Sequence, residues 1–213
     1  MIKVIIFDLD GLLVNSQPLQ YKAYNHVFSK YGYPLSSDEW EEWVQNSYNA
    51  NAWIKKHNLS LNPEKIRGEK KEIYDKLIAT ELNLMPGARK AIRLLSKKYR
   101  LCVASSSRIE SVKASLQKFN LDSNFEKVLS DTEMEKGKPH PHIFLKMAKL
   151  MQVSPQECCV IEDSSAGLKA AKLAGMKCIV CPDKFIKKQC SEYQNADKIV
   201  NSLEEINTQN ILE

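Results

Sequence analysis

Apolar runs of strand length alternate with segments of helical periodicity along most of the chain. Residues 4–7 form a continuous apolar run, while residues 143–151 carry apolar side chains at helical spacing. Continuous apolar runs are typical of strands buried on both faces, and their alternation with helices predicts a doubly wound parallel sheet, an α/β fold. We expect strands at 4–7, 101–104, 127–129, 159–161, 178–180 and 198–200, and helices at 89–98, 109–119 and 143–151.

Residues 16–84 show a different pattern, with helical periodicity and no convincing strand. Helices are expected at 19–31, 37–46 and 64–81. We therefore predict two domains, one formed by residues 1–15 and 85–213 and the other an inserted helical domain of residues 16–84. The connections between them would lie near residues 15–18 and 84–87.

Two carboxylates follow the first predicted strand directly. Because alternate side chains of a strand share a face, Asp8 and Asp10 are expected on one side, and Gly11 allows a tight turn after them. A pair of carboxylates suits a hard cation such as Mg²⁺, particularly beside a substrate phosphate. Taken alone, the same residues could form an ordinary loop turn, because Asp and Gly are common turn residues.

Three later segments also place polar side chains where a predicted strand ends or shortly after it. Ser105 and Ser106 follow the second strand and could hold phosphate oxygens or cap a helix. Lys138 lies in the run Lys-Gly-Lys-Pro, where a lysine could neutralise a nucleophile and a phosphate. Glu162 and Asp163 leave the fourth strand as an acidic pair. In open parallel sheets ligands bind beyond the carboxyl ends of the strands, where these groups fall.

The four segments, in this order, resemble those of the haloacid dehalogenase-like hydrolase superfamily, subfamily I, in its β-phosphoglucomutase and sugar-phosphatase branch. The resemblance covers nearly the whole chain and is most specific at residues 7–11, 136–139 and 161–168. It implies a Rossmann-like core with an inserted α-helical cap domain that closes over the active site. Such lids exclude water and select substrates.

The resemblance also implies a role for each matching residue. Asp8 would be the nucleophile that forms an aspartyl-phosphate, and Asp10 the general acid and base. The Mg²⁺ ion would be held by the Asp8 carboxylate, the Asp10 backbone carbonyl and Asp163. The supporting residues would be Ser105 and the Ser106 amide as a phosphate grip, Lys138 as a charge clamp, and Glu162 behind the metal ligands.

Several positions depart from the family pattern. Asn15 and Gln17 replace acids that relatives often carry, and His142 replaces an acid after the lysine motif. His140 and His142 are better explained as polar residues at a helix start than as a metal pair.

Mutases of this branch carry a cap histidine where this chain has Gln20, and residues 45–51 contain no arginine. Hydrolysis is therefore favoured over the alternative, a β-phosphoglucomutase-type reaction.

The insert holds all three tryptophans and an amide-rich segment. Aromatic residues at helical spacing usually pack together, so Trp40 and Trp43 are expected in a small core rather than against a sugar. Residues 45–51 are the best candidate for a loop that contacts substrate hydroxyls.

The complete set of expected catalytic groups disfavours two other classes. A non-catalytic binding or regulatory protein should have lost a nucleophile, lysine or metal acid, and a dehalogenase needs no acidic metal pair. We therefore predict a phosphatase of small phosphomonoesters, with sugar phosphates as the favoured partner. The particular substrate is not encoded in any of these motifs.

Composition agrees with a cytoplasmic enzyme of moderate size. The 213 residues are 43% hydrophobic, enough for a substantial core, and no run approaches the roughly 20 apolar residues of a membrane helix. The net charge of +5 combines 31 basic with 26 acidic residues and does not indicate nucleic-acid binding. The six cysteines, including Cys178 and Cys181, are expected to be buried thiols. A monomer is expected.

Overall fold

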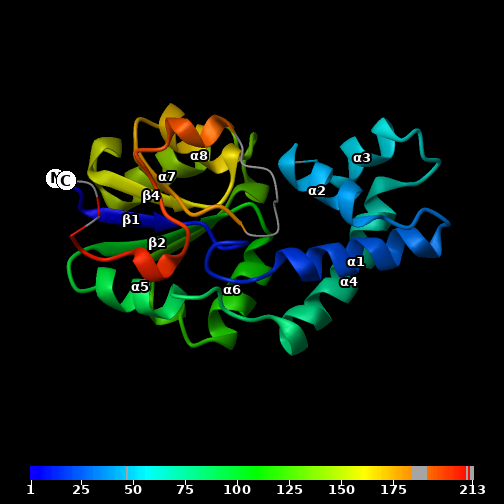
Figure 1. Cartoon of the computed structure of the whole chain (residues 1–213), viewed down its shortest axis with the longest axis horizontal. Helices are drawn as coiled ribbons and strands as arrows, with labels where there is room; N and C mark the ends of the chain where they lie inside the picture. The colour runs from blue at the N-terminus through cyan, green and yellow to red at the C-terminus, as the bar shows by residue number, and fades with distance from the viewer. Residues whose placement is uncertain (47, 184–190, 210, 212–213) are drawn as a thin grey trace. The chain divides into compact units, whose positions relative to one another are not determined.

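A computed structural model describes residues 1–46, 48–183, 191–209 and 211. The chain forms two compact units (Figure 1). The core unit contains Met1–Asn15, Asn83–Asp183 and the described C-terminal residues, and the helical unit contains Ser16–Leu82.

A parallel sheet forms the centre of the core unit. Within the described residues its six strands lie in the order β3-β2-β1-β4-β5-β6. They are β1 (Val4–Phe7), β2 (Arg100–Ser105), β3 (Lys127–Ser130), β4 (Cys158–Glu162), β5 (Lys177–Val180) and β6 (Lys198–Ile199). Each neighbouring pair is parallel. The order changes direction at β1, which is the topological switch point where ligands bind in open sheets of this class.

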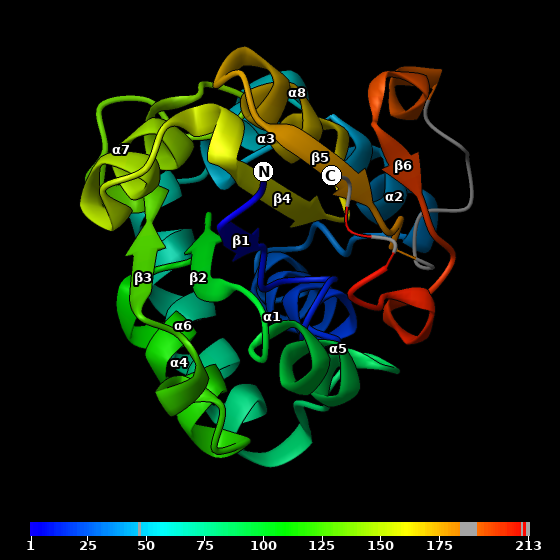
Figure 2. The ribbon, with the colours of Figure 1, turned by 90° about the vertical axis from the view of Figure 1, so that its left-hand side faces the viewer.

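Helices cover both faces of this sheet. Helices α7 (His142–Met151) and α8 (Ser165–Leu173) pack against the face that carries Ile6 and Val160. Helices α5 (Ala88–Leu95) and α6 (Ile109–Lys118) lie on the opposite side (Figure 2). Short 3₁₀ helices join these elements: η1 (Asp122–Asn124), η2 (Asp131–Glu133), η3 (Pro155–Glu157), η4 (Ser191–Asn195) and η5 (Leu203–Glu205). The predicted doubly wound α/β fold is confirmed.

Helix α7 illustrates how the sequence produces these layers. Its buried residues Ile143, Phe144, Met147, Ala148 and Met151 recur at helical spacing on one stripe. That stripe joins the apolar side chains of the sheet in one continuous core. Burial of each of the four larger side chains, those of Ile143, Phe144, Met147 and Met151, contributes about 1.5–3 kcal/mol, before the cost of ordering the chain. The apolar pattern is therefore sufficient to fix which side of α7 faces the sheet.

The predicted strands all occur, with ends that agree or shift by one residue. Helix α5 ends at Leu95 rather than at the expected residue 98. The amides of Lys98 and Tyr99 both donate to the Leu95 carbonyl, closing a turn that leads into β2.

The helical unit contains one helix that the sequence pattern did not predict. Its helices are α1 (Gln17–Lys30), α2 (Ser37–Gln45), α3 (Ala50–Lys56) and α4 (Pro63–Glu81). Residues 50 and 51, expected in a loop, belong to α3, because the Asn49 side chain accepts a hydrogen bond from the Ala52 amide and starts the helix there. Of the predicted loop, Ser47 lies outside the described residues.

The tryptophans form the core of the helical unit. Trp40, Trp43 and Trp53 are 2%, 5% and 1% exposed. The Trp43 ring centroid lies 5.6 Å from that of Trp40 and 5.2 Å from that of Trp53. The prediction that Trp40 and Trp43 pack in a small core is confirmed, and Trp53 joins them.

The two chain segments that leave and re-enter the core unit lie side by side. The Asn15 amide donates to the Asn83 carbonyl at 2.9 Å, and the Met85 amide donates to the Leu13 carbonyl at 2.9 Å. Both segments are thus held at the edge of the core unit, next to the turn that follows Asp10.

None of the described helices combines the length and apolar character needed to cross a bilayer. Five cysteines, Cys102, Cys158, Cys159, Cys178 and Cys181, are buried free thiols, as expected, and Cys190 lies outside the described residues.

Candidate active site

The predicted site residues gather at the carboxyl edge of the sheet. Phe7 of β1 is in register with Val103 of β2 and Ile161 of β4, so Asp8, Ser105 and Asp163 leave neighbouring strands at nearly the same level. This convergence follows from the parallel topology, which brings all the carboxyl ends of the strands to one side.

The ammonium group of Lys138 lies at the centre of this site. Its Nζ donates to Asp8 Oδ1 at 2.6 Å, to Glu162 Oε1 at 2.6 Å and to the Ala104 carbonyl at 3.0 Å. The side chains of Lys138, Asp8 and Glu162 are 4%, 8% and 0% exposed. All three donor positions of the ammonium are therefore used, and the lysine is fixed beside Asp8.

Glu162 supports the site from behind. Its Oε2 accepts hydrogen bonds from the Asp163 amide at 3.0 Å, the Ser164 amide at 3.1 Å and the Ser164 hydroxyl at 2.9 Å. Gly167 leaves room for this carboxylate, since a β-carbon there would collide with it. Both oxygens of the Glu162 carboxylate are therefore already engaged in hydrogen bonds.

Asp10 is held by the serine that ends β2. The Ser105 hydroxyl donates to Asp10 Oδ2 at 3.0 Å and accepts from the Ser107 amide at 2.9 Å. Ser105 is fully buried, whereas Asp10 is partly exposed. A carboxylate held in this way can take or give a proton at its exposed side.

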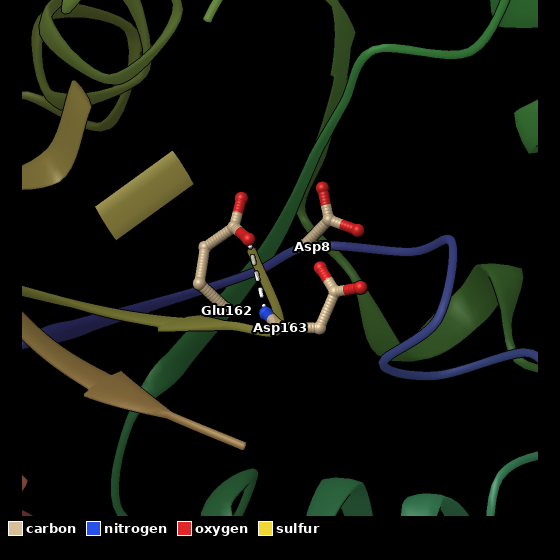
Figure 3. Close-up of side chains that lie close together, drawn as sticks. All are labelled: Asp8, Glu162 and Asp163. Carbon is tan, nitrogen blue, oxygen red and sulfur yellow. Dashed lines mark hydrogen bonds between the residues drawn. The ribbon is translucent and has the colours of Figure 1, made fainter. Parts of the chain in front are cut away.

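Asp8 and Asp163 present oxygen atoms to a common space. Ligand atoms of Asp8, Glu162 and Asp163 lie within 4.8 Å of one another, close enough for a metal ion. Figure 3 shows the carboxylates of Asp8 and Asp163 pointing to the same side, with the Glu162 carboxylate apart from them. Gly11 lines this space, because a β-carbon there would meet oxygens of Asp163 and Asp183. The all-oxygen donor set fits a hard cation such as Mg²⁺, which Asp8 and Asp163 would hold.

Burial and close charges shift the ionisation of these groups. Burial raises the pKa of Asp8 to about 8, against the opposing effect of Lys138 and with the help of Glu162 and Asp10. Burial, with Glu162, Asp8 and Asp183 nearby, raises the pKa of Asp163 well above its usual value. Burial opposes the charge of Lys138, but the carboxylates of Asp8 and Glu162 outweigh it and raise the pKa of the lysine. Burial also opposes the charge of Glu162, but Lys138 outweighs it and lowers the pKa of that carboxyl. A bound cation would favour the ionised carboxylates.

Three residues that contact the candidate site were not predicted from the sequence. Asp131 accepts hydrogen bonds from the Ser106 hydroxyl and the Lys138 amide. Asp183 lies beside Asp163 across from Gly11, and Tyr193 donates to the Asp163 carbonyl at 2.8 Å. Asp131 directly follows β3, as Asp8 follows β1, and that position was the signal that could have identified it. Nothing local to residues 183 and 193 indicates their neighbours.

His140 and His142 lie next to each other at the start of α7. The rings of His140 and His142 are 3.9 Å apart between centroids, and His142 is the first residue of α7, as a helix-starting role requires. Neither belongs to the cluster of possible metal ligands found among the described residues.

The sequence profile of haloacid dehalogenase-like hydrolases matches residues 5–181, a range that includes every one of the predicted site residues. The chain belongs to the haloacid dehalogenase-like hydrolases. The resemblance inferred from the four motifs is thereby confirmed, as is the expectation of an enzyme.

Two curated proteins are similar to this chain over most of its length. The phosphorylated carbohydrates phosphatase of Thermotoga maritima is 28% identical over 182 residues, which cover 82% of each protein. The beta-phosphoglucomutase of Bacillus subtilis is 30% identical over 185 residues, covering 82% of this chain and 80% of the relative. Both a phosphatase and a mutase thus occur among similar proteins.

A solved structure matches the fold closely. CbbY from Rhodobacter sphaeroides, in complex with phosphate, has a TM-score of 0.85 and 27% identity, and the match covers 96% of both chains. A mutant of CbbY has also been solved in complex with xylulose-(1,5)bisphosphate, with a TM-score of 0.85 and 26% identity.

Proposed function

We propose that the protein is a Mg²⁺-dependent phosphatase that hydrolyses small phosphomonoesters, chiefly sugar phosphates, through a phosphorylated Asp8. The observation that carries the proposal is the contact of Lys138 with Asp8, beside an Asp10 that is held by Ser105. This arrangement supplies a nucleophile, a charge clamp and a proton carrier at one sheet edge.

The reaction would proceed in two displacements. An oxygen of Asp8 attacks phosphorus and forms a new O–P bond, while the ester O–P bond breaks and Asp10 protonates the leaving alcohol. Asp10 then takes a proton from water, whose oxygen attacks the phosphorus, releases inorganic phosphate and restores the Asp8 carboxylate. When bound, Mg²⁺ would offset the negative charge of the phosphoryl group.

The remaining residues stabilise charge and hold geometry. Lys138 places a positive charge next to Asp8 and the equatorial phosphoryl oxygens, and the Ser106 amide would donate to one of those oxygens. Asp163 would share the cation with Asp8 and the Asp10 carbonyl. Glu162 keeps Lys138 and the Asp163 backbone in place.

The names of the similar proteins support sugar phosphates as the substrate class. One relative is a phosphatase of phosphorylated carbohydrates, and CbbY has been solved with a sugar bisphosphate. We propose that the helical unit acts as the cap that selects among such esters, with hinges near residues 15–18 and 84–87 and substrate contacts from residues 45–51.

The buried free thiols support a reducing compartment, the cytoplasm.

A mutase remains the second candidate, favoured by the 30% identity to a beta-phosphoglucomutase. A mutase must protect phosphorylated Asp8 from water and return the phosphoryl group to a turned substrate. Gln20 in α1 cannot supply the acid–base function of a histidine there. Hydrolysis therefore has the stronger support.

The deciding experiment measures phosphate release from a panel of sugar phosphates, nucleotides and phosphoglycolate, with and without Mg²⁺. Conversion of β-glucose 1-phosphate is followed in parallel. We expect release that EDTA abolishes and that Asp8→Asn lowers by at least about a thousandfold. The matched variant Asp38→Asn, in the first turn of α2, should retain activity. Isomerisation without release would establish the mutase, and Mg²⁺-dependent turnover by Asp8→Asn would overturn the mechanism.

A further inference from the structure

One oxygen of Asp131 connects two loops of the active site. Asp131 Oδ2 accepts a hydrogen bond from the Ser106 hydroxyl at 2.8 Å and another from the Lys138 backbone amide at 2.9 Å. Ser106 lies in the loop after β2, and Lys138 lies in the loop that precedes α7. These loops are far apart in sequence and meet at this single acceptor.

The environment of Asp131 is built to hold it there. Ser105 of β2 is in register with Ser130 of β3, so Ser106 and Asp131 leave adjacent strands at the same level. Asp131 is only 7% exposed. A β-carbon at Gly137 would lie 2.9 Å from Asp131 Oδ2, so the absence of a side chain there lets the loop approach the carboxylate.

The hydrogen bond from Ser106 to Asp131 uses the only proton of the serine hydroxyl. A hydroxyl has one proton, and Ser106 gives it to Asp131, so this hydroxyl cannot also donate to a phosphate oxygen. The Ser106 backbone amide remains the group that would bind phosphate. Asp131 thus holds the loop whose amide would bind phosphate in the proposed reaction.

The hydrogen bond from the Lys138 backbone amide to Asp131 holds the loop that carries the lysine. The Lys138 backbone is fixed by Asp131, while its ammonium reaches Asp8 and Glu162. A shift of this backbone would move the ammonium away from the transferring phosphoryl group, where small displacements are costly.

We propose that Asp131 is a positioning residue that sets the spacing between the Ser106 amide and the Lys138 ammonium, and thereby the affinity of the site for a phosphate group. The inference rests on the proposed function, because it assumes that these two groups bind the phosphoryl oxygens.

The test compares Asp131→Ala, Asp131→Asn and Ser106→Ala, with Asp122→Ala on exposed η1 as the matched control. Binding of inorganic phosphate in the presence of Mg²⁺ is measured by calorimetry, and KM and kcat are measured for the preferred ester. Because both bonds go to one oxygen, an amide oxygen can accept them, and Asp131→Asn should bind phosphate within threefold of wild type. Asp131→Ala should bind it at least tenfold more weakly, with a rise in KM.

A double variant that combines Asp131→Ala with Ser106→Ala tests whether Asp131 acts by positioning Ser106 or by a general loss of structure. If Asp131 acts partly through Ser106, the effects of Asp131→Ala and Ser106→Ala on phosphate binding should be less than additive. Wild-type phosphate affinity in Asp131→Ala would overturn this inference alone, as would an Asp131→Asn variant as weak as Asp131→Ala. A wild-type protein that neither binds nor releases phosphate would overturn both the inference and the proposed function.

Discussion

Lys138 and Asp8 are 130 residues apart in the chain, yet the lysine Nζ lies 2.6 Å from the aspartate Oδ1. Both side chains are almost completely buried. Glu162 Oε1 lies at the same distance of 2.6 Å from the ammonium. Lys138, Asp8 and Glu162 form a buried triad in the candidate active site. Because both carboxylates are buried, removal of the lysine would leave their charges without a partner and without water, which would lower the stability of the core unit.

Removal of the lysine ammonium should destabilise the protein. In Lys138→Ala two carboxylates lose their buried partner, and we expect the free energy of unfolding to fall by about 3–5 kcal/mol. The exposed pair of Lys22 with Glu81 provides a matched control, since Lys22→Ala should cost less than about 1 kcal/mol. Urea unfolding of both variants measures the difference. Equal losses in the two variants would contradict the importance of the buried triad.

Mg²⁺ should stabilise the protein through Asp163. A ligand present at 100 times its dissociation constant stabilises the folded state by about 2.7 kcal/mol, so the melting temperature should rise on addition of Mg²⁺. We expect Asp163→Asn to lose most of this rise. Asp122→Asn, on an exposed 3₁₀ helix of the same unit, should keep it. Thermal unfolding with MgCl₂ or EDTA checks the assignment, and an undiminished rise in Asp163→Asn would remove Asp163 from the metal site.

Glu157 should contribute stability that disappears in acid. The bond from Lys3, together with the Ser154 amide, lowers the pKa of Glu157 from 4.5 to about 2. The folded state therefore binds this proton less tightly than the unfolded state, so the contribution is present above pH 4.5 and lost as the pH falls toward 2.

The stability difference between wild type and Glu157→Gln should accordingly be largest near neutral pH and shrink over this acid range. Lys3→Met removes the strongest of the interactions that lower the pKa of Glu157. In a protein that carries Lys3→Met, the stability lost through Glu157→Gln should therefore be smaller than in the wild type. Denaturant titrations at several pH values give the comparison. Parallel pH curves for wild type and Glu157→Gln would show that the interaction does not favour the ionised form.

Trp53 should act as a packing residue rather than a platform for sugars. It is 1% exposed within the aromatic core of the helical unit, so Trp53→Ala should cost about 3–5 kcal/mol of stability. Tyr33→Ala, at a side chain that is 41% exposed, should change stability by about 0.5 kcal/mol or less. Thermal unfolding measures both effects. A stable Trp53→Ala variant with a strongly raised KM would instead indicate contact with substrate.

The positions of the strands and of most site residues could be predicted from the sequence because both signals are local. A continuous apolar run such as Val4–Phe7 encodes a strand buried on both faces, and the carboxylates that follow it mark its carboxyl end. Parallel topology then implies that Asp8, Ser105 and Asp163 converge. Helix α3 was missed because it is short and depends on the Asn49 cap more than on a long apolar repeat.

The sequence by itself thus determined the α/β alternation, the inserted helical segment and the polar groups that follow the strands. The tertiary structure alone decided that Lys138 bridges Asp8 and Glu162, that Ser105 holds Asp10, and that Asp131 joins two loops. The physical reason is that periodicity reports which side of an element is buried, whereas a hydrogen bond depends on the relative placement of elements. That placement comes from the packing of the whole sheet with its helices, to which residues distant in sequence contribute together.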